Sequence, residues 1–138
     1  MTRLPDRLPP LFQRFTTTRF IRFAVIGGTG VIVNLAVLHV FFAQLHWAPA
    51  IASALAVEAA ILSNFVGNNW WTFEQRTFSV FRLFKYNVVA LGGLVITTVT
   101  FTGLMQWFGI SYIVADLIGI GAATAWNFVA SVLWAWAT

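Results

Sequence analysis

Four long apolar stretches account for most of the chain. They cover residues 20–45, 50–73, 84–108 and 112–137, and their only basic residues, Arg22 and Lys85, stand in the first turn of a stretch. An α-helix needs about 20 apolar residues to cross the roughly 30 Å of bilayer hydrocarbon. Each stretch exceeds this minimum, so the pattern predicts an all-α integral membrane protein with four transmembrane helices.

The short segments between these stretches predict how the chain is oriented. The connections 46–49 and 109–111 contain no Lys or Arg, whereas the N-terminal segment and the 74–83 link are basic. All basic residues therefore fall on one side of the membrane: Arg3, Arg7, Arg14, Arg19, Arg22, Arg76, Arg82 and Lys85. Because basic segments stay cytoplasmic, we expect both termini in the cytoplasm and a multi-pass protein of the cytoplasmic membrane.

Composition predicts one membrane domain after a short tail. The chain has 138 residues, 59% hydrophobic and 9% charged, whereas soluble domains carry about 25% charged residues. We expect residues 20–138 to form the four-helix domain and residues 1–19 to form a basic tail, either on the membrane surface or flexible. The net charge of +4 lies at span ends, which favours anionic lipid headgroups as partners rather than nucleic acid.

The two halves of the chain resemble each other. Residues 22–73 align without a gap with residues 85–136. The alignment pairs Arg22 with Lys85, Gly30 with Gly93, Asn64-Phe65-Val66 with Asn127-Phe128-Val129, and Trp71 with Trp134. Both halves begin on the same side, so we expect two hairpins related as a parallel repeat, with any binding site between them.

Small and aromatic residues predict how the spans pack and where they end. The run Gly27-Gly28-x-Gly30 and the pair Gly92-Gly93 lie inside spans, where small residues let helices approach closely. Six tryptophans lie near span ends and are expected to anchor at the headgroup level: Trp47, Trp70, Trp71, Trp107, Trp134 and Trp136. Trp126 lies deeper and is expected to face another helix.

Catalytic signatures are missing from the sequence. There is no cysteine, no His/Cys cluster with metal-ligand spacing, and no Ser/His/Asp arrangement. The Gly27-Gly28-x-Gly30 run lies in an apolar helix and lacks the preceding strand that a phosphate-binding loop requires. We therefore expect no enzymatic activity and no cofactor or metal.

Polar residues inside the spans are the candidates for function. A carboxylate near mid-membrane costs about 2.5–3.5 kcal/mol by insertion scales, so Glu58 must be protonated, paired or in a wet cavity. Its role is either functional or a structural hydrogen bond. Four asparagines accompany it: Asn34, Asn64, Asn68 and Asn127. Their amides either bridge helices or bind sugar hydroxyls, and we expect Asn34, Glu58, Asn64 and Asn127 to share a crevice between the hairpins.

Basic residues form a cluster at the predicted cytoplasmic edge. It comprises Arg22, Arg76, Arg82 and Lys85. These residues orient the chain, and we also expect them to hold a lipid phosphate, because each basic residue near an anionic surface contributes about 1 kcal/mol.

Several of these motifs resemble the GtrA-like family. They are Arg22-Phe23-Ala24-Val25-Ile26-Gly27-Gly28, then Asn34, the segment 64–73 (NFVGNNWWTF), and the closing Asn127-Phe128 with Trp134. The resemblance covers about residues 19–137. It implies a role in cell-envelope polysaccharide synthesis, because family members are proposed to move polyprenyl-phosphate-linked sugars across the membrane. Related domains instead anchor polyprenyl-phosphate glycosyltransferases.

The leading hypothesis is therefore translocation of a polyprenyl-phosphate-linked sugar. In it, Asn34, Glu58, Asn64, Asn68 and Asn127 bind the sugar and the basic edge binds the phosphate. We expect a homo-oligomer, because four helices make a thin wall, and a separate membrane-associated glycosyltransferase as partner. The alternative is a non-catalytic anchor for such an enzyme. A small proton-coupled drug exporter is a third reading, which the one-sided charge disfavours.

Overall fold

The computed structural model describes residue 10 and residues 12–137. Most of the predicted 1–19 tail, including Arg3 and Arg7, lies outside the described residues. Within them the elements are η1 (Phe12–Arg14), α1 (Thr17–Leu38), η2 (His39–Gln44), α2 (Pro49–Gly67), η3 (Asn68–Thr72), α3 (Val80–Phe108), α4 (Tyr112–Ala130) and η4 (Ser131–Ala135). The element η1 is a 3₁₀ turn, and η2, η3 and η4 are π-helical turns that end α1, α2 and α4.

In the described part of the chain, four continuous helices are long and apolar enough to span a membrane, as predicted. They run over Thr17–Gln44, Pro49–Thr72, Val80–Phe108 and Tyr112–Ala135. Helices α1 and α3 begin three and four residues before their apolar stretches because a polar residue caps each start. The Thr16 hydroxyl accepts a hydrogen bond from the Arg19 backbone N–H at 3.2 Å, and the Ser79 hydroxyl accepts one from the Arg82 N–H at 3.2 Å.

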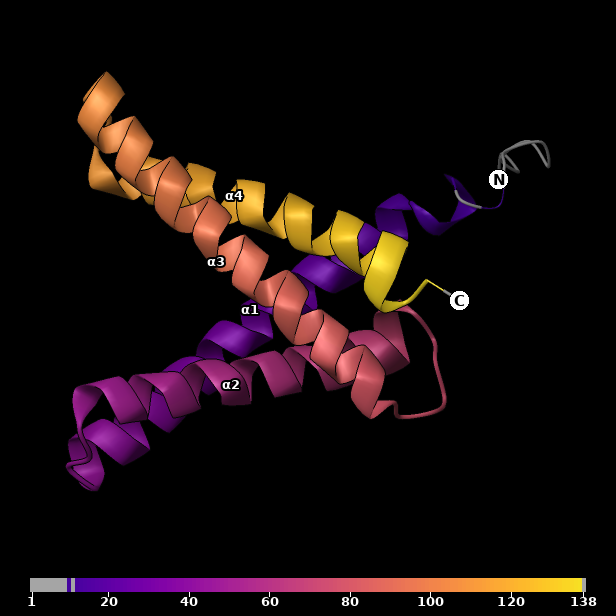
Figure 1. Ribbon diagram of the computed structural model, residues 1–138, viewed down its shortest axis with the longest axis horizontal. Helices are drawn as coiled ribbons and strands as arrows, with labels where there is room; N and C mark the ends of the chain where they lie inside the picture. The colour runs from indigo at the N-terminus through magenta and orange to yellow at the C-terminus, as the bar shows by residue number, and fades with distance from the viewer. Residues whose placement is uncertain (1–9, 11, 138) are drawn as a thin grey trace.

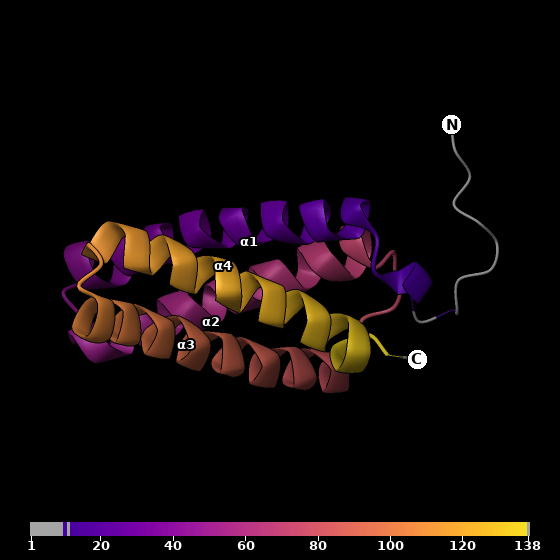
Figure 2. The ribbon, with the colours of Figure 1, turned by 90° about the horizontal axis from the view of Figure 1, so that it is seen from above.

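The helices form two hairpins arranged as a V (Figure 1). Helix α1 packs on α2, and α3 packs on α4. The hairpins meet at the end that carries the α2–α3 link, the start of α1 and the end of η4, and they diverge toward the two tight turns. Viewed from above, the four helices all lie along the long axis of the molecule (Figure 2). We call the end where the hairpins meet the closed end.

An aromatic cluster joins the hairpins at the closed end. Trp136 stacks on Phe73 with ring centroids 4.4 Å apart and on Phe65 at 5.6 Å. Phe23 of α1 meets Phe128 of α4 edge to face at 5.6 Å. Away from this cluster, long rows of Val, Leu and Ile remain exposed on the protein surface. Such a surface suits lipid, so the four spans and their exposed apolar faces make this a multi-pass membrane protein.

Small residues bring the helices of each hairpin together. In α2 the buried positions are Ala52, Ala56 and Ala60, and in α4 the aligned positions Ala115, Gly119 and Ala123 are buried. A Cβ added at Gly119 would lie 3.1 Å from the Thr97 carbonyl oxygen, so α3 and α4 are in close backbone contact there. Membrane helices make such close contacts through small residues that are four positions apart.

The sequence repeat extends to the backbone. The hairpin turns contain His46 and Gly109 at aligned positions, with φ of 56° and 62°. The Trp47 N–H donates to the Phe41 carbonyl at 2.9 Å, and the aligned Ile110 N–H donates to the Leu104 carbonyl at 3.2 Å. The π-helical turns η3 and η4 also occupy aligned positions. The halves therefore share one hairpin design, as the parallel repeat predicted.

The predicted glycine packing is right for Gly92-Gly93, and in the run Gly27-Gly28-x-Gly30 it is right for Gly30 alone, where a Cβ would overlap the Asn64 amide. A Cβ at Gly92 would lie 2.7 Å from the Trp126 indole nitrogen, and one at Gly93 would overlap the Asn127 amide. A Cβ at Gly27 or Gly28 would meet nothing within 4 Å. The reason is that Gly27 and Gly28 face the space between the hairpins rather than their partner helix.

The tryptophans mostly follow the anchoring prediction, with one exception. Five of the six at span ends are exposed, from 44% for Trp47 to 83% for Trp107. Trp136 is buried instead, because it lies inside the aromatic cluster. Trp126 faces α3 as expected, where its indole N–H donates to the Val89 carbonyl at 3.0 Å.

Candidate functional site

A cavity of about 370 Å³ lies between the two hairpins, next to the aromatic cluster. Its volume falls in the range typical of small-molecule sites, about 300–1,000 Å³. All four helices contribute to its wall. The lining residues are Phe23, Ala24, Gly27, Gly28, Val31, Asn64, Tyr86, Thr97, Ile120, Ala123, Thr124 and Asn127.

Asn64 and Asn127 are the amides of this cavity, one from each half of the repeat. The Oδ1 atom of each is buried and has no hydrogen-bond partner among the described residues. Each amide lies against a glycine of its own hairpin, Gly30 for Asn64 and Gly93 for Asn127, and a Cβ there would overlap the amide. The glycines therefore make room for the amides. An unpaired buried acceptor costs about 1–3 kcal/mol, so this arrangement favours a ligand that donates hydrogen bonds.

Two threonines add polar surface that the sequence did not distinguish. The Thr97 hydroxyl donates to the Gly93 carbonyl at 3.1 Å, and the Thr124 hydroxyl donates to the Ile120 carbonyl at 2.8 Å. The Thr97 hydroxyl also lies within donating distance of the Gly119 carbonyl of α4, at 3.4 Å. Because both protons are directed to backbone carbonyls, the hydroxyl oxygens remain as acceptors. Among the lining residues none is charged. The cavity is thus suited to a neutral ligand rich in hydroxyl donors, such as a sugar.

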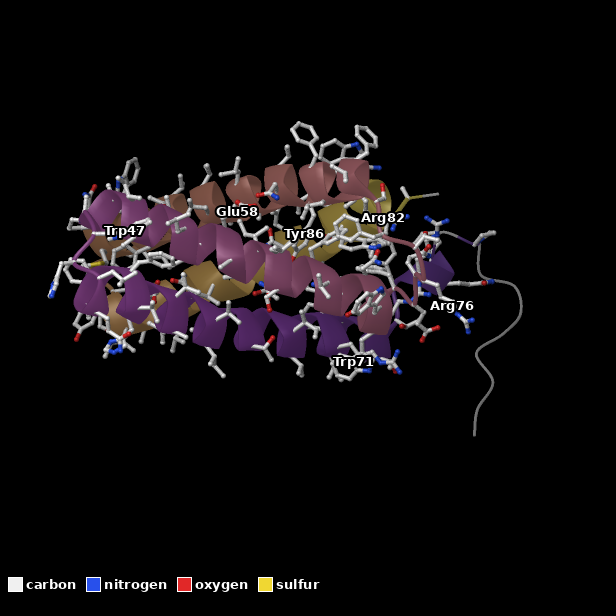
Figure 3. The ribbon with its side chains drawn as sticks, turned by 90° about the horizontal axis from the view of Figure 1, so that it is seen from below. Trp47, Glu58, Trp71, Arg76, Arg82 and Tyr86 are labelled. Atoms are coloured by element: carbon white, nitrogen blue, oxygen red, sulfur yellow. The ribbon has the colours of Figure 1, made fainter. Side chains whose placement is uncertain are left out.

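Glu58 and Asn34 do not join this cavity, in contrast to the expected single crevice. Glu58 is exposed, on the α2 face that also exposes Leu55 and Leu62. In Figure 3, Glu58 lies partway along the length of the helices, well away from Arg76 and Trp71 at the closed end. The cause is helical geometry, because a residue two positions from the buried Ala56 lies on the opposite face. Asn34 is half-buried in α1 and is also absent from the lining.

Asn68 is part of the closed end rather than of the cavity wall. It is buried, its Nδ2 donates to the Tyr86 hydroxyl at 3.4 Å, and its Oδ1 accepts from the Thr72 hydroxyl at 2.8 Å. Both hydrogen bonds stay inside the protein. The position of Asn68 therefore supports a structural role joining α2 to α3.

The predicted basic edge is largely engaged with the protein itself. Arg22 donates from Nη1 to the Trp71 carbonyl at 3.0 Å and to Glu74 Oε1 at 3.0 Å. At the aligned position, Lys85 Nζ donates to the Trp134 carbonyl at 3.0 Å. These two carbonyls lie in η3 and η4, the last turns after α2 and α4, where backbone acceptors lack intrahelical donors. Arg22 and Lys85 therefore cap the corresponding helix ends of the two halves in the same way.

Arg82 and Arg76 complete that edge. Arg82 Nη1 donates to Asn69 Oδ1 at 2.9 Å and to the Thr77 carbonyl at 3.1 Å, whereas Arg76 is exposed. Arg76, Arg82 and Trp71 all lie toward the closed end in Figure 3. Three of the four basic residues therefore stabilise helix ends and the link, and this leaves them fewer donors for a phosphate.

Asn69 is a structural residue that sequence reasoning missed. Its Oδ1 also accepts from the Trp136 indole N–H at 3.0 Å, and its Nδ2 donates to the carbonyls of Gln75 and Thr77. One buried amide thus ties α2, the link, α3 and the end of α4 together. The only signal in the sequence was its place in the segment 64–73.

Comparison with known proteins agrees with the resemblance seen in the sequence. The family model for the GtrA/DPMS transmembrane domain matches residues 22–136. A dolichol-phosphate mannosyltransferase of Pyrococcus furiosus is 36% identical over 122 residues, which are 87% of this chain and 34% of that protein. The chain thus spans about a third of the length of this curated relative. By its match over nearly the whole chain, it belongs to the family of GtrA/DPMS transmembrane domains.

Proposed function

We propose that this chain translocates a polyprenyl-phosphate-linked sugar across the cytoplasmic membrane for cell-envelope polysaccharide synthesis. The observation that carries the proposal is that Asn64 and Asn127, whose amide oxygens have no partner among the described residues, line one cavity from the two repeats. The family and the mannosyltransferase relative support a substrate that combines a sugar with a polyprenyl phosphate.

The physical problem of translocation matches what this cavity offers. Moving one hydroxyl into hydrocarbon without a partner costs about 2–7 kcal/mol, so a hexose with several hydroxyls does not cross a bilayer unaided. The side chains of Asn64, Asn127, Thr97 and Thr124 would replace hydrogen bonds that the sugar otherwise makes with water. The polyprenyl chain stays in lipid beside the exposed apolar faces of the helices.

Reconstitution in vesicles tests this proposal. Purified protein is placed in liposomes with a fluorescent polyprenyl-phosphate sugar, and the fraction reaching the opposite leaflet is followed with time. We expect transport well above protein-free vesicles. A rate equal to that of protein-free vesicles would overturn the proposal.

Variants then identify the path. Asn64→Ala and Asn127→Ala are each expected to slow transport about tenfold, because each removes a hydrogen-bond acceptor from the sugar. Gln106→Ala is the matched control, since Gln106 is exposed near the far end of α3. Glu58→Gln is expected to retain most activity, because Glu58 lies outside the cavity. Normal transport by both asparagine variants would exclude this cavity as the path.

Anchoring of a polyprenyl-phosphate glycosyltransferase is the second candidate. It is favoured by the relative, in which the matched region is about a third of a mannosyltransferase. In this case the 74–83 link would contact the enzyme. Replacing that link would then abolish sugar transfer in cells, whereas Asn64→Ala and Asn127→Ala would be tolerated. Co-purification of a glycosyltransferase with the wild-type chain but not with the link variant distinguishes this role from transport.

A further inference from the structure

The cavity between the hairpins lies mainly against two helices that come from different halves of the repeat. Five of its twelve lining residues belong to α1 and four belong to α4. The exposed lining residues are Ala24, Gly28 and Val31 of α1 and Ile120 of α4, whereas Tyr86 of α3 is buried. The cavity therefore opens to the surface between α1 and α4, and its back wall comes from α2 and α3.

Aromatic rings hold α1 and α4 together at one side of this opening. Phe20 and Phe23 of α1 both meet Phe128 of α4 edge to face, with ring centroids 5.3 and 5.6 Å apart. One helical turn after Phe23, the same face of α1 carries Gly27, and Gly28 follows it. The opening thus begins where the side chains of α1 change from large rings to none.

The two glycines leave space that no neighbouring atom fills. A Cβ added at Gly27 or Gly28 would meet nothing within 4 Å. Gly30 and Gly93 differ, because a Cβ at either position would overlap an asparagine amide. Close helix packing therefore does not require Gly27 or Gly28, and a side chain at either position would occupy space in the cavity.

The other half of the repeat carries side chains at the corresponding positions. Gly27 and Gly28 align with Ala90 and Leu91 of α3. Glycine inside a helix is less favourable than alanine, so two glycines that pack against nothing lower helix stability without a gain in packing. What their missing side chains provide is room in the cavity that also contains the amide of Asn127.

We infer that Gly27 and Gly28 are specificity-determining residues, which set the size of the sugar that the cavity admits. The inference rests on the proposed function for the identity of the ligand, and it adds residues that select by size to the amides that accept hydrogen bonds. The sugar enters between α1 and α4, while its polyprenyl chain remains in the lipid outside the opening. One methyl group at either glycine then reduces the room for the substituents of the sugar ring.

Binding of two lipid-linked sugars to the full chain in detergent micelles tests this inference. Mannosyl farnesyl phosphate carries the sugar named for the relative, and lyxosyl farnesyl phosphate lacks only its hydroxymethyl group. We expect Gly27→Ala and Gly28→Ala each to weaken binding of the mannosyl compound about tenfold, because one carbon in a close-fitting pocket changes discrimination by about 10–200-fold. Binding of the lyxosyl compound should be nearly unchanged.

Three results of this experiment would overturn the inference. They are equal weakening of both compounds, no weakening of either, and no binding of the mannosyl compound by the wild type. The first would show a general loss of the site rather than selection by size. The other two would show that the space beside the glycines does not receive the sugar.

Gly103→Ala is the matched control. A Cβ at Gly103 also meets nothing within 4 Å, but Gly103 is not among the lining residues. We expect this variant to bind both compounds as the wild type does. All three variants should have a Tm equal to or above that of the wild type, because alanine favours a helix more than glycine does. A lower Tm for Gly27→Ala or Gly28→Ala, or weaker mannosyl binding by Gly103→Ala, would contradict the inference.

The vesicle transport experiment separates this inference from the proposed function. If the two glycine variants lose mannosyl binding and keep lyxosyl binding, but the wild type transports neither compound, selection by size stands and translocation fails. If the wild type transports the mannosyl compound and both glycine variants bind and transport it equally well, translocation stands and selection by size fails.

Discussion

At the scale of single residues, buried amides play two different roles in this protein. Asn69 has its oxygen and nitrogen satisfied by Arg82, Trp136 and two link carbonyls. Asn64 and Asn127 have oxygens that no described residue satisfies. Because no described residue compensates those two oxygens, we propose that the cavity amides bind ligand, whereas Asn69 stabilises the closed end.

Replacing Asn69 tests the first assignment. We expect Asn69→Ala to lower the free energy of unfolding by about 2–3 kcal/mol, because the Trp136 indole and the Arg82 guanidinium lose their common acceptor. Asn87→Ala is the control, since Asn87 donates only to the Leu83 carbonyl of its own helix. Equilibrium unfolding in detergent micelles measures both. Equal losses in the two variants would show that Asn69 does not join the closed end.

At the scale of elements, glycines decide how closely the helices of each hairpin approach. Gly30 and Gly93 stand at aligned positions and face the amides of Asn64 and Asn127. Gly103 belongs to the same helix as Gly93 but has open space around its missing side chain. The same substitution at these two positions of α3 therefore has different consequences.

Gly93→Ala is expected to destabilise the protein by about 1–3 kcal/mol, because the new methyl group overlaps the Asn127 amide and forces α3 from α4. Gly103→Ala should be neutral or slightly stabilising, since alanine favours a helix more than glycine does. Thermal unfolding of both variants, compared with the wild type, provides the measurement. An unchanged Tm for Gly93→Ala would contradict the close contact between α3 and Asn127.

At the scale of the whole molecule, the described residues place basic side chains at the closed end and the two hairpin turns at the opposite end. Arg22, Arg82 and Lys85 lie at the closed end, where they bond to helix-end and link groups. Basic residues near helix ends are retained in the cytoplasm, so the closed end is expected to face the cytoplasm.

Single cysteines test this orientation, because the chain has no cysteine of its own. We expect Ser111→Cys, in the α3–α4 turn, to react with a membrane-impermeant maleimide in intact spheroplasts. Thr77→Cys, exposed in the link, should react only after the membrane is permeabilised. The reverse pattern would place the termini outside, and labelling of both sites in intact spheroplasts would indicate two orientations.

The length, hydropathy and spacing of the apolar stretches were sufficient to predict much of this fold. The four spans follow from length and hydropathy, and their ends agree closely with the stretches. The predicted repeat register pairs the residues of η3 with those of η4, and one hairpin turn with the other. The earlier starts of α1 and α3 had a visible signal as well, in Thr16 and Ser79, whose hydroxyls cap the helices.

The candidate site was only partly within reach of the sequence. Asn64 and Asn127 were expected to meet, because both are polar, intramembrane and aligned in the repeat. Glu58 and Asn34 are also polar and intramembrane, but they do not line the cavity.

The sequence by itself determined that the chain spans a membrane four times, that it repeats, and which end carries the positive charge, because these depend on local composition. Only the tertiary structure decided which face of each helix meets protein and which meets lipid. In a soluble helix, polar residues mark the outer face. Here both faces are apolar, since lipid and protein interior solvate side chains alike, so the packing partner alone decides that Asn64 faces a cavity and Glu58 does not.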